Sequence, residues 1–83
     1  MTKQEIFTVI QQIIAEQTGN HVEDIVGTTH LQDELGILGQ DFARIVNSIN
    51  EALKITLSAS EIEEESETVN SLVTIAFEES ELG

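Results

Sequence analysis

The chain contains no cysteine among its 83 residues. This absence excludes a disulfide framework and a zinc site built on thiolates, so a packed apolar core has to hold the fold together. Proline is also absent, and neither an internal repeat nor a linker divides the chain. We therefore expect a single domain that covers residues 1–83.

Basic residues are scarce, with 3 lysines and arginines against 16 acidic residues and a formal net charge of −13. This balance argues against a nucleic-acid partner, because phosphates attract the opposite sign. It favours protein partners with basic docking patches, which long-range attraction would bring in and salt would weaken. The alternative is that the charge serves solubility alone, as it does in many acidic proteins.

Long apolar runs are missing as well. No stretch approaches the roughly 20 apolar residues of a membrane span. The first residues, Met1 to Glu5, do not form a basic region followed by an apolar run, which is the pattern of a secretory leader. We expect a soluble, cytoplasmic protein with no membrane partner.

The spacing of apolar residues predicts a first helix from about Thr2 to Gly19. Its apolar positions fall on one side of a helix. They are Ile6, Val9, Ile10, Ile13 and Ile14, with Phe7 widening the stripe. Thr2 followed by Glu5 fits a capping box at the start, and Gly19 is a typical stop.

From Asn20 to Leu38 the helical periodicity fades, and glycines and threonines indicate an irregular loop. Loops of this length in compact domains are usually functional or pinned by their own apolar residues. The residues expected to pin this one are Val22, Ile25, Leu31, Leu35 and Ile37.

A second helix is expected from Gly39 or Gln40 to Lys54. One face carries Phe42, Ile45, Val46, Ile49 and Leu53, which could line an apolar pocket but more typically form plain core. Asp41 in the first turn and Lys54 at the other end suit the helix dipole.

The sequence after Lys54 predicts a short third helix and a longer last helix. Ser58 with Glu61 fits a capping box for a helix that ends near Ser66 and is anchored by Ile62. The last helix begins near Thr68 and precedes an acidic tail. Its inward residues are Val69, Leu72, Val73, Ala76 and Phe77, and the tail contains Glu78, Glu79 and Glu81. The fold class is all-α, a bundle of three longer helices and one short helix.

Two patterns could indicate chemistry, and both have a plainer interpretation. His21 and His30 have no serine, cysteine or second histidine at a telling spacing, so we interpret them as polar loop residues and assign no catalytic residue. The acidic run from Glu61 to Glu67 offers oxygen ligands, yet no Asp-x-Asp-x-Asp-Gly loop is present. We interpret it as a solvated acidic face and assign no metal site.

Three segments carry a resemblance to a known family. They are Thr29 to Gly36, Ile45 to Glu51 and Thr68 to Val73. They look like the loop before the second helix, the body of that helix and the start of the last helix in the acyl carrier family of fatty-acid, polyketide and nonribosomal peptide synthesis. The resemblance implies a four-helix carrier fold with a long loop between the first two helices. It also implies a 4′-phosphopantetheine arm on a serine that follows an aspartate.

This chain departs from the family at that attachment point. The alignment with the family needs no gap between Glu34 and Glu51. It places Leu38 at the position of the family's aspartate and Gly39 at the position of its serine. Attachment requires a hydroxyl oxygen, and glycine has no side-chain nucleophile. Ser48 lies about two helical turns further on, where the family's geometry would not present it. We therefore expect a variant site without the arm.

The resemblance also implies partner docking on the exposed part of the second helix, at Gln40, Asp41, Arg44 and Glu51. Arg44 stands where related carriers usually have glutamate, so one docking charge is inverted. A plainer role for Arg44 is an ion pair with Asp41, worth about 0.2–0.5 kcal/mol on a helix surface. The implied partners are ketosynthases, acyltransferases or phosphopantetheinyl transferases with basic patches, and a monomer is expected.

The interpretation that follows is a non-enzymatic, acyl-carrier-like interaction module of fatty-acid or polyketide-type biosynthesis. Two alternatives stay open. The first is a working acyl or peptidyl carrier whose serine has been substituted in this chain. The second is an acidic adapter protein that binds a basic partner and has no part in acyl transfer.

Overall fold

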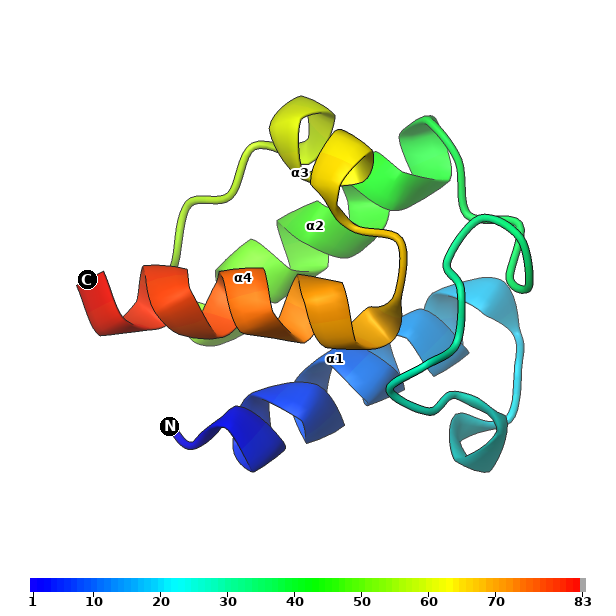
Figure 1. Cartoon of the computed structure of the whole chain (residues 1–83), viewed down its shortest axis with the longest axis horizontal. Coiled ribbons are helices and arrows are strands. Elements are labelled where there is room, and N and C mark those ends of the chain that lie inside the picture. Colours follow the sequence, from blue (N-terminus) through cyan, green and yellow to red (C-terminus); the bar gives the residue numbers. More distant parts are fainter. Residues whose placement is uncertain (83) are drawn as a thin grey trace.

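The computed structural model describes residues 1–82 and folds them into four α-helices and one short 3₁₀ helix. The elements are α1 (Lys3–Thr18), η1 (Val22–Asp24), α2 (Gln40–Leu53), α3 (Ala59–Glu65) and α4 (Val69–Leu82). Helix α4 runs back along α1 in the opposite direction, and α3 lies over α2 (Figure 1). The expected all-α bundle of three longer helices and a short one is confirmed. The 3₁₀ turn within the long loop is an addition to that prediction.

The first helix begins and ends as its sequence predicts. The Thr2 hydroxyl accepts a hydrogen bond from the Glu5 N–H at 3.2 Å, and the Glu5 carboxylate accepts one from the Thr2 N–H at 2.7 Å. The hydrogen bond from the Thr2 backbone N–H holds the pKa of the Glu5 carboxyl below its usual range, and the Thr2 side chain beside the carboxyl lowers it further. Gly19 ends α1 in the left-handed conformation, with φ at 77°.

The short helix α3 begins differently from the prediction. Ser58 precedes it, but the Ser58 hydroxyl lies 3.3 Å from the Ser60 hydroxyl and caps no backbone N–H, so the expected capping box is wrong. Helix α4 begins near Thr68 as predicted, and the Thr68 hydroxyl accepts the Ser71 N–H at 3.2 Å, a contact that was not predicted from the sequence. Helix α4 also continues to Leu82, so the expected acidic tail is helical.

The long loop between α1 and α2 is held by buried residues and by hydrogen bonds to the chain around Thr68. Ile25, Leu31 and Ile37 are buried, as predicted, and Leu35 is half-buried. Val22 is 38% exposed, so its predicted pinning role is wrong. It begins the surface turn η1, where its carbonyl, rather than its side chain, makes a contact by accepting the Gln11 side-chain amide at 2.9 Å.

Backbone pairing ties the same loop to the start of α4. The Leu31 N–H donates to the Glu67 carbonyl at 2.9 Å, and the Val69 N–H donates to the Thr29 carbonyl at 3.0 Å. These bonds satisfy backbone groups that the loop would otherwise bury without partners. The middle of the loop, at Thr29 and Leu31, is therefore fixed against the start of α4.

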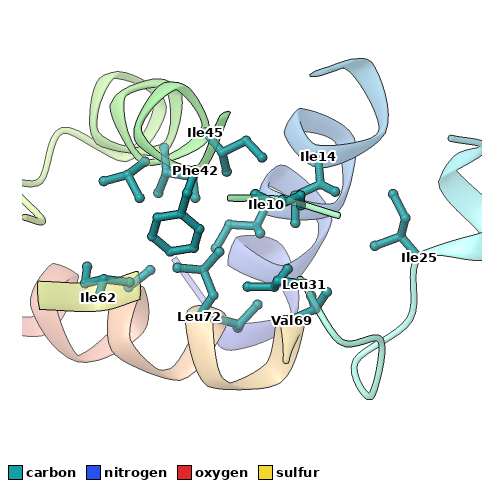
Figure 2. Packing of buried hydrophobic residues seen from close by; sticks show 14 of the residues in the cluster. Ile10, Ile14, Ile25, Leu31, Phe42, Ile45, Ile62, Val69 and Leu72 are labelled. Carbon is teal, nitrogen blue, oxygen red and sulfur yellow. The ribbon is translucent and has the colours of Figure 1, made fainter. Parts of the chain in front are cut away.

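A single cluster of buried side chains draws on all four α-helices and on the loop. Its members include Ile6, Ile10, Ile14, Ile25, Leu31, Phe42, Ile45, Ile49, Ile62, Val69 and Leu72. Phe42 points from α2 toward Ile62 and Leu72 and is 2% exposed (Figure 2). The interpretation of the α2 stripe as core is confirmed, although Leu53 at its end is half-buried.

No helix within residues 1–82 is long and apolar enough to cross a membrane. The longest, α1, has 16 residues.

Candidate functional site

The segment that leads into α2 brings Leu38 and Gly39 to the surface. Ile37, one residue earlier, is buried and its N–H donates to the Leu31 carbonyl at 3.0 Å. Leu38 is 56% exposed and Gly39 is exposed as well. The loop thus anchors itself through Ile37 and presents the next two residues to solvent.

Gly39 has a backbone conformation that glycine favours. Its φ is 54° and its ψ is −117°, and the Asp41 N–H donates to the Leu38 carbonyl at 3.1 Å. The dihedral angles and the closing hydrogen bond match the first central position of a type II′ turn, about +60° and −120°. A Cβ at this position would meet no atom within 4 Å. The backbone conformation, and not a lack of space, is therefore what favours glycine here.

The backbone N–H of Gly39 donates a hydrogen bond to the Glu63 carboxylate of α3 at 3.0 Å. A carboxylate near the start of a helix also suits the helix dipole of α2. Sequence reasoning missed this contact because 24 residues separate the partners and no local pattern connects them. The sequence offered one signal for this turn, which is the glycine directly before the apolar stripe of α2. That glycine is compatible with a turn that needs glycine as well as with the replacement of the family's serine.

The chain near Gly39 offers no nucleophile. No serine, threonine, tyrosine or cysteine occurs between Gln32 and Asn47. Ser48 is the first hydroxyl after Gly39; it is half-buried and accepts a hydrogen bond from the Gln17 side-chain amide of α1 at 2.7 Å. Its hydroxyl therefore faces α1. Residues 33–47 do not fit a covalently attached phosphate ester, which needs an accessible oxygen.

The exposed face of α2 contains the residues proposed for docking. At about 100° per residue, Gln40, Arg44 and Glu51 lie in one stripe opposite the buried face. Asp41 lies to one side and pairs with Arg44 at 3.6 Å, with both side chains about two thirds exposed or more. This confirms the expected ion pair, whose energetic value at such exposure is small.

The structure brings three of these four residues close to Gly39. Gln40, Asp41 and Arg44 occupy the first turns of α2, whereas Glu51 is in its last turn. A rise of about 1.5 Å per residue sets Glu51 about 17 Å along the helix from Gln40. The candidate site is therefore the start of α2, and Glu51 belongs to the same stripe at its other end.

An open groove lies beside this site, between the end of α1, the loop and α2. It is lined by Gln17, Leu35, Ile37, Asp41, Arg44 and Ser48. Asp41 and Arg44 thus belong both to the surface next to Gly39 and to the groove. The Gln17 to Ser48 hydrogen bond crosses from α1 to α2 among these residues.

The two histidines lie apart from any catalytic arrangement. His21 is exposed and precedes η1, while His30 is half-buried and lines an open pocket with Asp33, Glu63 and Glu64. Through Glu63 this pocket adjoins the contact with Gly39. Among residues 1–82 no group of three histidine or carboxylate side chains is arranged to hold a metal ion.

The family model described as "Phosphopantetheine attachment site" matches residues 8–75. This chain belongs to the phosphopantetheine attachment family. The matched range includes Gly39 and the whole of α2. The expected relationship to acyl carrier proteins, which are carriers rather than enzymes, is confirmed by this membership and by named relatives.

Two acyl carrier proteins illustrate the similarity. One, from Saccharopolyspora erythraea, is 30% identical over 63 residues, which cover 76% of this chain and 66% of that protein. The other, from Cyanidium caldarium, is 33% identical over 58 residues, which cover 70% of this chain and 67% of that protein. The chain thus spans about two thirds of the length of these family members. The family implies 4′-phosphopantetheine as its prosthetic group.

Proposed function

We propose that this member of the phosphopantetheine attachment family is an acyl-carrier-like interaction module that does not receive the prosthetic arm. The observation that carries the proposal is Gly39 at the start of α2, in a segment with no hydroxyl or thiol from Gln32 to Asn47. The neighbouring Leu38 is apolar and exposed where the family resemblance expects an aspartate.

The proposed role is the docking of biosynthetic enzymes in a fatty-acid or polyketide-type system, by a monomer in the cytoplasm. Support for docking comes from the exposed stripe of α2 and from the net charge of −13, which would attract ketosynthases, acyltransferases or transferases with basic patches. Because Asp41 pairs with Arg44, the start of the stripe is nearly neutral and Leu38 adds apolar surface there. A partner suited to this end of α2 would combine an apolar contact with its basic residues.

The proposal is tested by intact mass spectrometry after incubation with coenzyme A and a broad-specificity phosphopantetheinyl transferase. We expect the unaltered chain to keep its mass, because position 39 offers no nucleophile. The double variant Leu38→Asp with Gly39→Ser should gain the arm and serves as the matched control. Circular dichroism of both proteins verifies that the helices are retained.

Addition of an arm to the unaltered chain would overturn the proposal. Peptide mapping would then locate the modified residue, and the variant Ser48→Ala would show whether that hydroxyl is the acceptor. Modification after Gly39→Ser alone would instead favour a working carrier whose serine was substituted. Failure to bind any purified ketosynthase or acyltransferase would favour the acidic adapter.

A further inference from the structure

We propose that Gly39 and Glu63 form a latch that fixes α3 against the start of α2, and that the latch requires glycine at position 39. The latch is defined as the 3.0 Å hydrogen bond from the Gly39 backbone N–H to the Glu63 carboxylate. On this proposal the glycine has a structural role of its own and is more than a missing serine side chain. This structural role would hold whether or not an arm is attached elsewhere in the chain.

Helix α3 needs such a contact because little else holds it. It has seven residues, one of which, Ile62, is buried, and no side chain caps its N-terminus. A helix this short is not stable alone in water. Its glutamates, including Glu61 and Glu65 four residues apart, repel one another on the helix surface.

The flanks of α3 are held by other groups. Asn50 of α2 forms two hydrogen bonds with the Leu57 backbone, at 3.0 and 2.8 Å. On the other side, the Leu31 N–H donates to the Glu67 carbonyl. Within residues 1–82, the latch is the one hydrogen bond that joins a residue of α3 itself to a neighbouring helix start. The apolar packing of Ile62 and the partly buried Ala59, together with the latch, therefore sets how α3 lies on α2.

The latch depends on the conformation of Gly39. The φ of 54° and ψ of −117° are accessible to glycine and strongly disfavoured for an L-amino acid. An L-residue at this position would relax toward negative φ, which rotates the Leu38 to Gly39 peptide relative to α2. That rotation would turn the N–H away from Glu63 and release the latch.

Stereochemistry provides a direct test of the glycine requirement. Chemically synthesised chains with L-Ala or with D-Ala at position 39 add the same methyl group at an exposed position, but only the D-residue favours the observed dihedral angles. We expect L-Ala to lower the folding equilibrium constant about 5- to 100-fold in urea unfolding. D-Ala should leave that constant equal to or above its value for the unaltered chain. Equal stability of the two synthetic chains would overturn the requirement for glycine.

The role of Glu63 is tested by amide hydrogen exchange on the variants Glu63→Ala and Glu64→Ala. Both remove one carboxylate from α3 and introduce the same good helix former. Glu63 is half-buried and Glu64 exposed, and of the two only Glu63 accepts the Gly39 N–H, so exchange of the Gly39 amide reports on the latch. We expect Glu63→Ala to speed exchange of the Gly39 amide and of residues 62–66 about tenfold, with α1 and α4 unchanged. Glu64→Ala should leave the Gly39 amide protected.

The same exchange measurement can also overturn the latch. Equal exchange of the Gly39 amide in the Glu63→Ala and Glu64→Ala variants would show that Glu63 holds nothing, and would overturn the latch. The mass-spectrometric test of the proposed function uses a different readout, so either proposal can fail while the other stands.

Discussion

Thr29 and Ser66 are two buried hydroxyl residues that differ in hydrogen bonding. They are 5% and 4% exposed. The Thr29 hydroxyl accepts the Val26 N–H at 3.0 Å, whereas the Ser66 hydroxyl has no hydrogen-bond partner within residues 1–82. Burial of an unpaired hydroxyl costs about 1–3 kcal/mol. Ser66 therefore weakens the fold, while Thr29 supports its loop.

The contrast predicts opposite effects for two conservative substitutions. Ser66→Ala should raise the free energy of unfolding by about 1 kcal/mol, because it removes the unpaired group and keeps the Ser66 N–H bond to Ile62. Thr29→Val should lower it by about 1–2 kcal/mol, because the Val26 N–H loses its acceptor. Urea unfolding followed by circular dichroism measures both values. A loss of stability in Ser66→Ala would show that its hydroxyl has a partner after all.

At the scale of elements, α1 and α2 end in the same backbone conformation with different residues. Gly19 follows α1 with φ at 77°, and Lys54 follows α2 with φ at 58°. Glycine adopts this left-handed conformation without steric cost, whereas other residues are strained by about 1–2 kcal/mol. The end of α2 is thus less favourable than the end of α1, although the lysine charge suits the carboxyl end of the helix.

This comparison predicts that Lys54→Gly stabilises the protein. We expect a gain of about 0.5–1 kcal/mol, the relief of strain being partly offset by the lost charge at the helix end. Lys54→Ala is the matched control, because it removes the charge and retains the strain. Gly19→Ala should destabilise by about 1 kcal/mol for the same reason. Thermal melts of the three variants measure these changes, and a stabilising Lys54→Ala would contradict the strain argument.

For the whole molecule, charge repulsion acts across the full width of the fold. The net charge of −13 is carried by a body with extents of 31 × 25 × 19 Å. At about 0.01 M salt the screening length is about 30 Å, so the carboxylates repel one another across the whole molecule. The opposite charges provide little relief, since Arg44 pairs with Asp41 at the exposed surface and Lys3 lies over the Phe77 ring.

Added salt should therefore stabilise the protein at neutral pH. Raising sodium chloride from about 0.01 to about 0.15 M shortens the screening length to about 8 Å and should raise the melting temperature by several degrees. Choline chloride at the same ionic strength separates screening from specific cation binding. A melting temperature that stays constant or falls with salt would show that repulsion does not limit this fold.

Much of the fold could be predicted from the sequence because its signals are local. The capping box at Thr2 and the stop at Gly19 involve residues within one turn of the helix end, and the stripe around Phe42 repeats with the helical period. Ser58 resembled Thr2 in pattern, yet its hydroxyl meets Ser60 instead of the backbone. A capping pattern in the sequence indicates which hydrogen bonds are possible. The local backbone geometry determines which of them forms.

By itself the sequence determined the all-α class, the register of α2 and the absence of a nucleophile from Gln32 to Asn47, since each depends on residue type and spacing along the chain. Only the tertiary structure decided that Gly39 turns with positive φ, that Glu63 binds its N–H, and that Ser48 is engaged by Gln17. These contacts join residues 24 and 31 positions apart. Such pairs meet only because the common core fixes α1, α2 and α3 relative to one another, which no local pattern encodes.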